Sequence, residues 1–139
     1  MLCSDFVLQL LPLGRFAFRF NPETVRALVP DDVAGVYLLL FEGEGIYIGR
    51  SDTCLRTRLA YHPYLRYASY FTYEICRNSH RAFYLEAYWF HRLQRDKFQR
   101  FLNCIHPAKP QGFSQRCPFC TPNDSKAIKH VLSKLGILG

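Results

Sequence analysis

The chain has 139 residues, of which 49% are hydrophobic, and this composition excludes an intrinsically disordered protein and suits one domain with a hydrophobic core. Its formal net charge of +7 favours a polyanionic partner such as nucleic acid. No segment approaches the ~20 apolar residues of a membrane span, so no membrane partner is expected. The N-terminal stretch 1–13 lacks the basic region of a signal peptide. We therefore expect an intracellular protein, cytoplasmic or nucleoid-associated, whose six cysteines are thiols or metal ligands.

Residues 1–31 are the first of three predicted regions, a lead-in that packs on the core. Asn21-Pro22-Glu23 is typical of a helix start, because asparagine is a favoured N-cap and proline is favoured at the first helical position. The helix is expected to end near Pro30.

Two short tyrosine motifs, Gly35-Val36-Tyr37 and Tyr47-Ile48-Gly49, lie ten residues apart in the second region, residues 32–110. An apolar run and a glycine-rich stretch, Leu38–Phe41 and Glu42–Gly45, separate them. The pattern predicts a buried strand, a hairpin loop and a second short strand. Because side chains alternate along a strand, the right register would place both tyrosines on one face. Each tyrosine taken alone fits a place in the core equally well.

A helix is predicted after the second motif, with Ser51 or Asp52 as its N-cap. Arg58 and His62 are four residues apart and flank its apolar stripe, so they would project together from one side of the helix. Arg56 is interpreted as a solvated basic residue.

A third strand is predicted over Tyr70–Ile75, which is rich in aromatic and β-branched residues. A second, longer helix follows over Asn78–Leu93, with Asn78 or Ser79 as its cap. Glu86 falls inside the apolar face of this helix, where an ionised carboxylate is costly to bury without a partner or a metal. An arginine partner and a functional site are both open as explanations.

Over residues 32–110 the chain resembles the GIY-YIG nuclease domain. Gly35-Val36-Tyr37 matches the first motif with Val in place of Ile, and Tyr47-Ile48-Gly49 matches the second. Arg58 matches the arginine of the first helix of that family, and His62 matches the histidine one helical turn later in the same helix. Each match alone is weak, but their common order makes the set specific.

Two further residues extend the resemblance. Glu86 matches the metal-ligand glutamate of the long helix, and Asn103 matches the asparagine near the end of the domain. The stretch from Gly49 to Arg58 is about one residue longer than the family pattern. Because of that difference, Arg56 is a second, weaker candidate for the position of the family arginine that Arg58 is expected to occupy.

The resemblance implies an α+β fold with a small three-stranded antiparallel sheet flanked by helices, and a metal-dependent DNA endonuclease. Glu86 would hold one Mg2+ or Mn2+ ion, and Tyr37 would be the general base. Arg58 would give a fixed charge to the phosphate. A phenol needs nearby positive charge to ionise at neutral pH, and Arg58, His62 and the metal are the expected sources.

The remaining site residues have positioning roles by the same resemblance. Tyr47 would orient the attacking water or bind the phosphate, and Asn103 would position a backbone or phosphate group. DNA is the expected partner, and a second copy of the chain or a targeting protein are further candidates. A non-cleaving nucleic-acid-binding module on the same fold is the alternative. The expected site residues are Tyr37, Tyr47, Arg58, His62, Glu86 and Asn103.

The third region, residues 111–139, is rich in proline and is expected to hold a C-x-x-C turn followed by a short helix from about Ser125 to Leu135. Two cysteines in this spacing, together with an upstream cysteine and histidine, are typical of a structural zinc site. Reduced, buried thiols are the alternative. The candidate ligands are Cys104, His106, Cys117 and Cys120.

Overall fold

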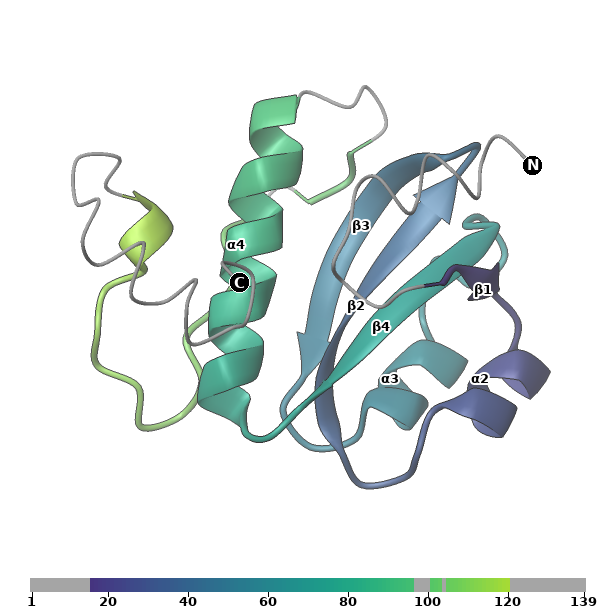
Figure 1. Cartoon of the computed structure of the whole chain (residues 1–139), viewed down its shortest axis with the longest axis horizontal. Helices are drawn as coiled ribbons and strands as arrows, with labels where there is room; N and C mark the ends of the chain where they lie inside the picture. The colour runs from purple at the N-terminus through teal and green to yellow at the C-terminus, as the bar shows by residue number, and fades with distance from the viewer. Residues whose placement is uncertain (1–15, 97–100, 104, 121–139) are drawn as a thin grey trace.

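The structure is a computed structural model that describes residues 16–96, 101–103 and 105–120. This part of the chain is α+β, with a four-stranded antiparallel sheet in the order β1-β4-β2-β3 and three α-helices (Figure 1). The strands are β1 (Phe18–Arg19), β2 (Ala34–Phe41), β3 (Glu44–Ser51) and β4 (Tyr70–Cys76). The helices are α2 (Pro22–Leu28), α3 (Leu55–Ala60), α4 (Ser79–Asp96) and the short 3-10 helix η1 (Pro118–Cys120).

The α+β class is confirmed, but the prediction of three strands is wrong by one strand. In β1, Phe18 pairs with Phe71 and Arg19 with Tyr70, at the edge of β4. A strand of two residues is too short to show an alternating pattern, so it exists only because β4 offers it hydrogen-bonding partners. The helix predicted for 125–135 lies outside the described residues.

β2 and β3 form the predicted hairpin. Its turn residues Glu42 and Gly43 have φ angles of 52° and 81°, and two positive φ values are typical of a type I′ turn. The register pairs Tyr37 with Gly49, which is two residues beyond Tyr47. Tyr37 and Tyr47 therefore lie diagonally on the same face of the sheet, as the alternation of side chains along the two strands allowed.

α2 begins as predicted. The side-chain oxygen of Asn21 accepts a hydrogen bond from the backbone N–H of Thr24 at 2.8 Å, and Pro22 is the first helical residue. None of the helices in the described ranges is long and apolar enough to cross a membrane.

α3 differs from the prediction at both ends. Cys54 is its N-cap, because β3 continues to Ser51 and the hydroxyl of Ser51 accepts hydrogen bonds from Thr53 and Cys54 in the intervening turn. The helix ends at Ala60, so His62 lies beyond it and does not share a helical face with Arg58.

A hydrophobic core lies on each face of the sheet, one beneath α4 and one beneath α2 and α3 (Figure 1). The apolar face predicted for α4 is confirmed, since all five of its residues are buried. They are Ala82, Leu85, Trp89, Phe90 and Leu93.

Candidate active site

Tyr37 lies at the centre of an aromatic cluster on the α3 face of the sheet. Its side chain is fully buried, and its ring stacks on Tyr47 with 6.2 Å between centroids. The ring of His62 stands edge-on to both, 5.3 Å from Tyr37 and 5.2 Å from Tyr47. Tyr64 completes the cluster, 5.4 Å from both Tyr47 and His62. The structure therefore brings three of the predicted site residues into direct contact.

The hydrogen bonds of His62 define its tautomer. The backbone N–H of Tyr64 donates to Nδ1 at 3.0 Å, so Nδ1 carries no proton. In the neutral ring the proton is then on Nε2, which donates to the hydroxyl oxygen of Tyr37 at 2.8 Å. Burial, together with the charge of Arg58, lowers the pKa of His62 to about 4. His62 is thus a neutral hydrogen-bond donor at pH 7, not the cation that the sequence suggested.

The phenol of Tyr37 is strongly perturbed. Burial raises its pKa well above the ordinary value, and the neighbouring Tyr47 and Glu86 act in the same direction. The charge of Arg58 lowers the pKa of Tyr37 in opposition. In the absence of a metal or a ligand, Tyr37 is therefore protonated at neutral pH. It can act as a base only when further positive charge is brought near.

Both motif glycines are required by close contacts. A Cβ on Gly49 would fall inside the van der Waals envelope of the Tyr37 ring, with Cε1 only 2.9 Å away. A Cβ on Gly35 would meet the carbonyl oxygen of Glu74 at 2.6 Å and the side chain of Leu55 at 2.7 Å. Gly49 thus leaves the space that the phenol of Tyr37 occupies, and Gly35 lets β2 approach β4 and α3 closely.

Glu86, on α4, is only 8% exposed and is paired with an arginine. The Nη1 group of Arg50, on β3, donates to Glu86 Oε1 at 2.7 Å, while Nε of Arg50 donates to Asp52 at 2.7 Å. Burial nevertheless raises the pKa of Glu86 despite the opposing effect of Arg50. An arginine partner for Glu86 was expected as one of two explanations, but Arg50 was not identified from the sequence. Its position directly after Gly49, on a strand that continues past the motif, is the signal that could have found it.

Glu86 and Arg58 are coupled to the aromatic cluster by their charges. The carboxylate of Glu86 raises the pKa of both Tyr37 and Tyr47, although burial is the larger cause. Arg58, exposed on α3, lowers the pKa of Tyr37, Tyr47 and Glu86. Electrostatic coupling of this kind requires that the groups lie near one another. Five of the six predicted site residues, all but Asn103, are therefore linked by ring contacts or by their charges.

Arg56 has a different role from Arg58. Its Nε donates to the carbonyl oxygen of Val29 at 2.8 Å, and its Nη1 lies 4.0 Å from a carboxylate oxygen of Asp31. These contacts fasten α3 to the chain that follows α2. Of the two arginines, Arg58 is therefore the one whose charge acts on Tyr37.

Asn103 lies against the outer edge of β3. Its side-chain oxygen accepts a hydrogen bond from Ile48 N–H and its amide group donates to Ile48 C=O, both at 2.8 Å. The backbone N–H of Leu102 donates to Ile46 C=O at 2.7 Å. Leu102 and Asn103 thus form hydrogen bonds with the free edge of β3, as a further strand of the sheet would do. Asn103 holds the backbone of Ile48, the middle residue of the second motif, and we regard it as a positioning residue.

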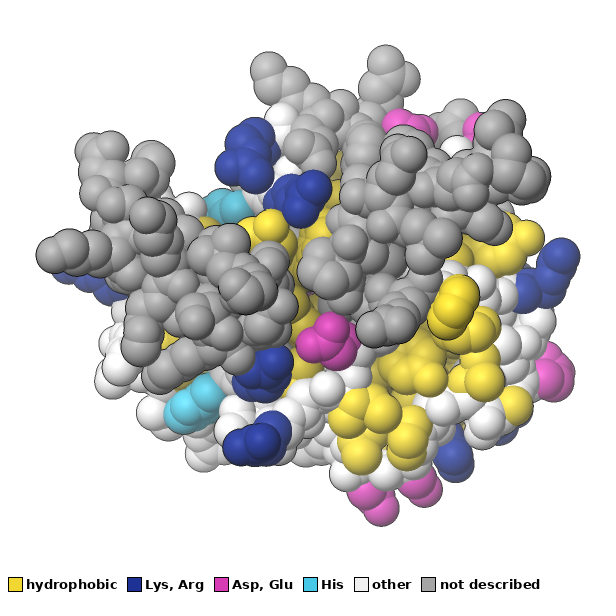
Figure 2. Space-filling view, in the orientation of Figure 1, with side chains coloured by type: hydrophobic (Ala, Val, Ile, Leu, Met, Phe, Trp, Pro, Cys, Tyr) yellow, Lys and Arg dark blue, Asp and Glu magenta, His cyan; other side chains and the backbone are white. Residues whose placement is uncertain are grey.

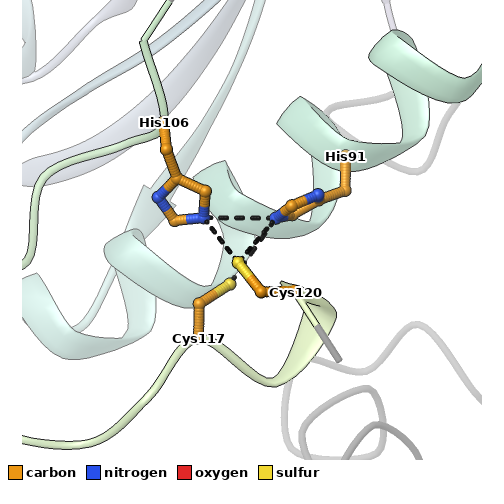
Figure 3. Close-up of side chains that lie close together, drawn as sticks. All are labelled: His91, His106, Cys117 and Cys120. Atoms are coloured by element: carbon orange, nitrogen blue, oxygen red, sulfur yellow. Dashed lines mark hydrogen bonds between the residues drawn. The ribbon is translucent and has the colours of Figure 1, made fainter. Parts of the chain in front are cut away.

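Four thiol and imidazole groups converge at a second place, on α4 and the segment that follows it (Figure 3). They belong to His91, His106, Cys117 and Cys120, and their donor atoms all lie within 4.8 Å of one another. Three of the four were predicted, whereas Cys104 lies outside the described residues. His91 was missed because it precedes the other ligands by a turn of α4 and a connecting segment. A histidine in the last half of α4, beside a downstream C-x-x-C turn, was the available signal.

The surface carries basic and aromatic side chains beyond the cluster. In the view of Figure 2, Lys and Arg side chains occur in small, separate groups, with hydrophobic and acidic side chains among them. The segment that follows α3 exposes three neighbouring residues of these types: Tyr61 at 75%, Tyr67 at 45%, and Arg66 between them. This segment includes Tyr64, so an exposed basic and aromatic surface adjoins the Tyr37 cluster.

Comparisons of the chain with family models, with curated proteins and with solved structures find no match.

Proposed function

We propose that this chain is a metal-dependent DNA endonuclease of the GIY-YIG type that hydrolyses phosphodiester bonds. The observation that carries the proposal is the hydrogen bond from His62 to Tyr37, inside a tyrosine cluster that is electrostatically coupled to Arg58 and Glu86. A cluster that served packing alone would not need a buried carboxylate and a guanidinium acting on the same phenol.

Glu86 would hold one Mg2+ or Mn2+ ion. Arg50 binds its Oε1, and among the described residues no hydrogen bond reaches Oε2, so Oε2 is the candidate metal ligand. A single carboxylate suits Mg2+, which retains several of its waters. When bound, the ion supplies Lewis-acid stabilisation of the phosphate and of the leaving oxygen.

The residues of the chain would divide the remaining tasks. Tyr37 would accept the proton of the attacking water once substrate binding uncovers its hydroxyl, which is buried in the free chain, and the N–H of His62 would stabilise the phenolate that proton transfer requires. Arg58 neutralises charge on the non-bridging phosphate oxygens. Tyr47, which is half-buried beside Tyr37, orients the water. Because the pKa of Tyr37 is raised, the rate of cleavage should increase with pH on the alkaline side of neutrality.

The exposed segment after α3 supports DNA as the substrate. Phenol rings such as that of Tyr61 can stack on bases, and Arg66 can contact phosphate. The net charge of +7 acts in the same direction. DNA as a substrate also implies an intracellular location, and a second copy of the chain would be needed if both strands are cut by one complex.

The test is nicking of supercoiled plasmid in the presence of Mg2+ or Mn2+, with DNA binding measured in parallel. The native chain should nick, and Glu86→Gln should bind DNA but lose at least ~100-fold in nicking rate, since it removes the metal ligand with little change in shape. Glu74→Gln, which alters a half-buried carboxylate on β4, is the control for the same change of residue type and should nick normally.

Equal nicking by the native chain and Glu86→Gln would refute the assignment of Glu86. If the native chain binds DNA yet fails to nick it with either metal, the alternative is favoured, a nucleic-acid-binding module that does not cut. A panel of duplex, flap, branched and single-stranded substrates would then define which DNA is bound or cleaved.

A further inference from the structure

We propose that the four converging side chains bind one structural Zn2+ ion, which fastens the segment after Asn103 to α4. The ligands come from three separate places in the chain: α4, the stretch just beyond Asn103, and the two ends of the turn that contains η1 (Figure 3). The proposal does not depend on nuclease activity. The ligands are His91, His106, Cys117 and Cys120.

Four of the six distances between the donor atoms are close to the edges of a tetrahedron around zinc, and the other two are at most 4.8 Å. With the usual Zn–N and Zn–S bond lengths, two nitrogens lie about 3.4 Å apart and a nitrogen and a sulfur about 3.6 Å apart. The Nε2 atoms of His91 and His106 are 3.2 Å apart. Cys120 Sγ is 3.4 Å from His91 Nε2 and 3.2 Å from His106 Nε2. Cys117 Sγ is 3.7 Å from His91 Nε2.

The second nitrogen of His106 is arranged as in a metal-bound histidine. Its Nδ1 lies 2.9 Å from the carbonyl oxygen of Pro107. A carbonyl can only accept, so Nδ1 carries the proton and Nε2 presents its lone pair to the other three donors. A metal-ligating imidazole commonly donates its other N–H to such an acceptor, which fixes its orientation.

The donor types and their separation select zinc over other ions. Mg2+ and Ca2+ prefer oxygen ligands, whereas two thiolates and two imidazoles in a tetrahedral arrangement suit Zn2+. An iron–sulfur cluster with this ligand set places the thiolates and the imidazoles on different irons. That arrangement would separate sulfur from nitrogen by more than the 3.2 to 3.7 Å between these atoms. Cys117 and Cys120 are free thiols, so no disulfide competes for them.

The ion would tie down the chain after α4 at a second point. Asn103 attaches this chain to β3, and the ligand His106 follows three residues later. Further along, Cys117 packs against Phe83 and Ala87 of α4 in a small hydrophobic cluster. Such a cluster has few buried residues, and metal binding can supply the folding free energy that a small core lacks.

The test is the metal content of the full-length chain, purified under reducing conditions and dialysed against a weak chelator. The native chain should contain about one Zn2+ per molecule. Cys120→Ser and His91→Asn should each retain less than about a tenth of that amount, because three ligands hold structural zinc poorly. The matched controls, Cys54→Ser and His80→Asn, change the same residue types outside the cluster and should keep the ion.

Cys104→Ser should also keep the ion, since four ligands are complete without it. Expression in cobalt-supplemented medium gives a readout that does not require a variant to fold, because the native chain should show the visible absorption of a tetrahedral cobalt–thiolate site. Native protein without zinc and without this absorption would overturn the proposal. So would full zinc occupancy in both Cys120→Ser and His91→Asn. None of these outcomes depends on whether the chain nicks DNA.

Discussion

Tyr37 is fixed by three neighbours that lie far apart in the sequence. Gly49 leaves space for its ring, His62 donates to its hydroxyl, and Tyr47 stacks on its face. Each of these contacts restricts the phenol to one orientation. A buried phenol held in this way is better suited to a defined chemical role than one of the solvent-exposed tyrosines.

Gly49→Ala should force the Tyr37 ring out of its position. Overpacking of this kind costs about 1 to 3 kcal/mol in the free energy of unfolding, and nicking should fall because the general base moves. Urea denaturation and the plasmid assay measure the two effects. In a Tyr37→Ala background the added methyl group meets no ring, so Gly49→Ala should then cost much less. Equal costs in both backgrounds would show that the ring is not what excludes a side chain at position 49.

His62 should make the chain sensitive to acid. Its pKa is about 4 in the folded chain, against an ordinary value of 6.5, so between these pH values the unfolded chain binds the proton more readily. Stability should therefore fall as the pH drops from about 6.5 to 4, by on the order of 3 kcal/mol from this residue. Denaturation midpoints measured across that range should fall less steeply for His62→Gln. Parallel pH profiles for the two proteins would contradict a buried, neutral His62.

At the level of elements, β3 is the strand on which the site depends. It carries Tyr47, Gly49 and Arg50, yet among the described strands it lies at the edge of the sheet, beside β2. The segment of Leu102 and Asn103 supplies hydrogen bonds on its free side. Without these hydrogen bonds, β3, which carries the second motif, would be open to fraying or to pairing with another chain.

Asn103→Asp should weaken this edge selectively. The carboxylate can still accept from Ile48 N–H, but it cannot donate to Ile48 C=O, so a cost of about 1 to 3 kcal/mol in the free energy of unfolding is expected. Nicking should fall through kcat with little change in DNA binding. Asn21→Ala removes a helix cap worth about 1 kcal/mol from α2 and serves as the control, with normal nicking expected. Equal loss of nicking in both variants would mean that stability alone is responsible.

In the molecule as a whole, the sheet separates the two candidate sites. Tyr37 and its neighbours belong to the core beneath α2 and α3, whereas the ligands of the proposed zinc lie on α4 and the segment beyond it. Glu86, also on α4, is the charged residue that links that side to the tyrosines. α4 therefore takes part in both sites, from different positions along its length.

The exposed segment after α3 should separate two kinds of DNA contact. Tyr61→Ala should weaken binding by about 1 to 3 kcal/mol through lost stacking, with the salt dependence nearly unchanged. Arg66→Ala should weaken binding and lower the slope of log K against log salt by about 1, because one phosphate contact is lost. Fluorescence anisotropy over a series of salt concentrations measures both. Unchanged affinity in both variants would place the DNA elsewhere on the surface.

The sequence by itself determined the features that local patterns encode. The N-cap of α2, the hairpin of β2 and β3 and the apolar face of α4 follow from turn chemistry and periodicity, which act over a few residues. The resemblance also selected residues that the structure brings together, among them Tyr37 and His62. The helix cap, the hairpin and the apolar face could be anticipated because each relies on spacing within one element or between adjacent ones.

Only the tertiary structure decided which distant groups meet. The pairing of Arg50 with Glu86, the addition of β1 to the sheet and the place of His91 beside Cys117 and Cys120 all join segments from different parts of the chain. No local pattern specifies such contacts, because they depend on how the elements pack. Burial, which lowers the pKa of His62 and raises that of Tyr37, arises from the same packing.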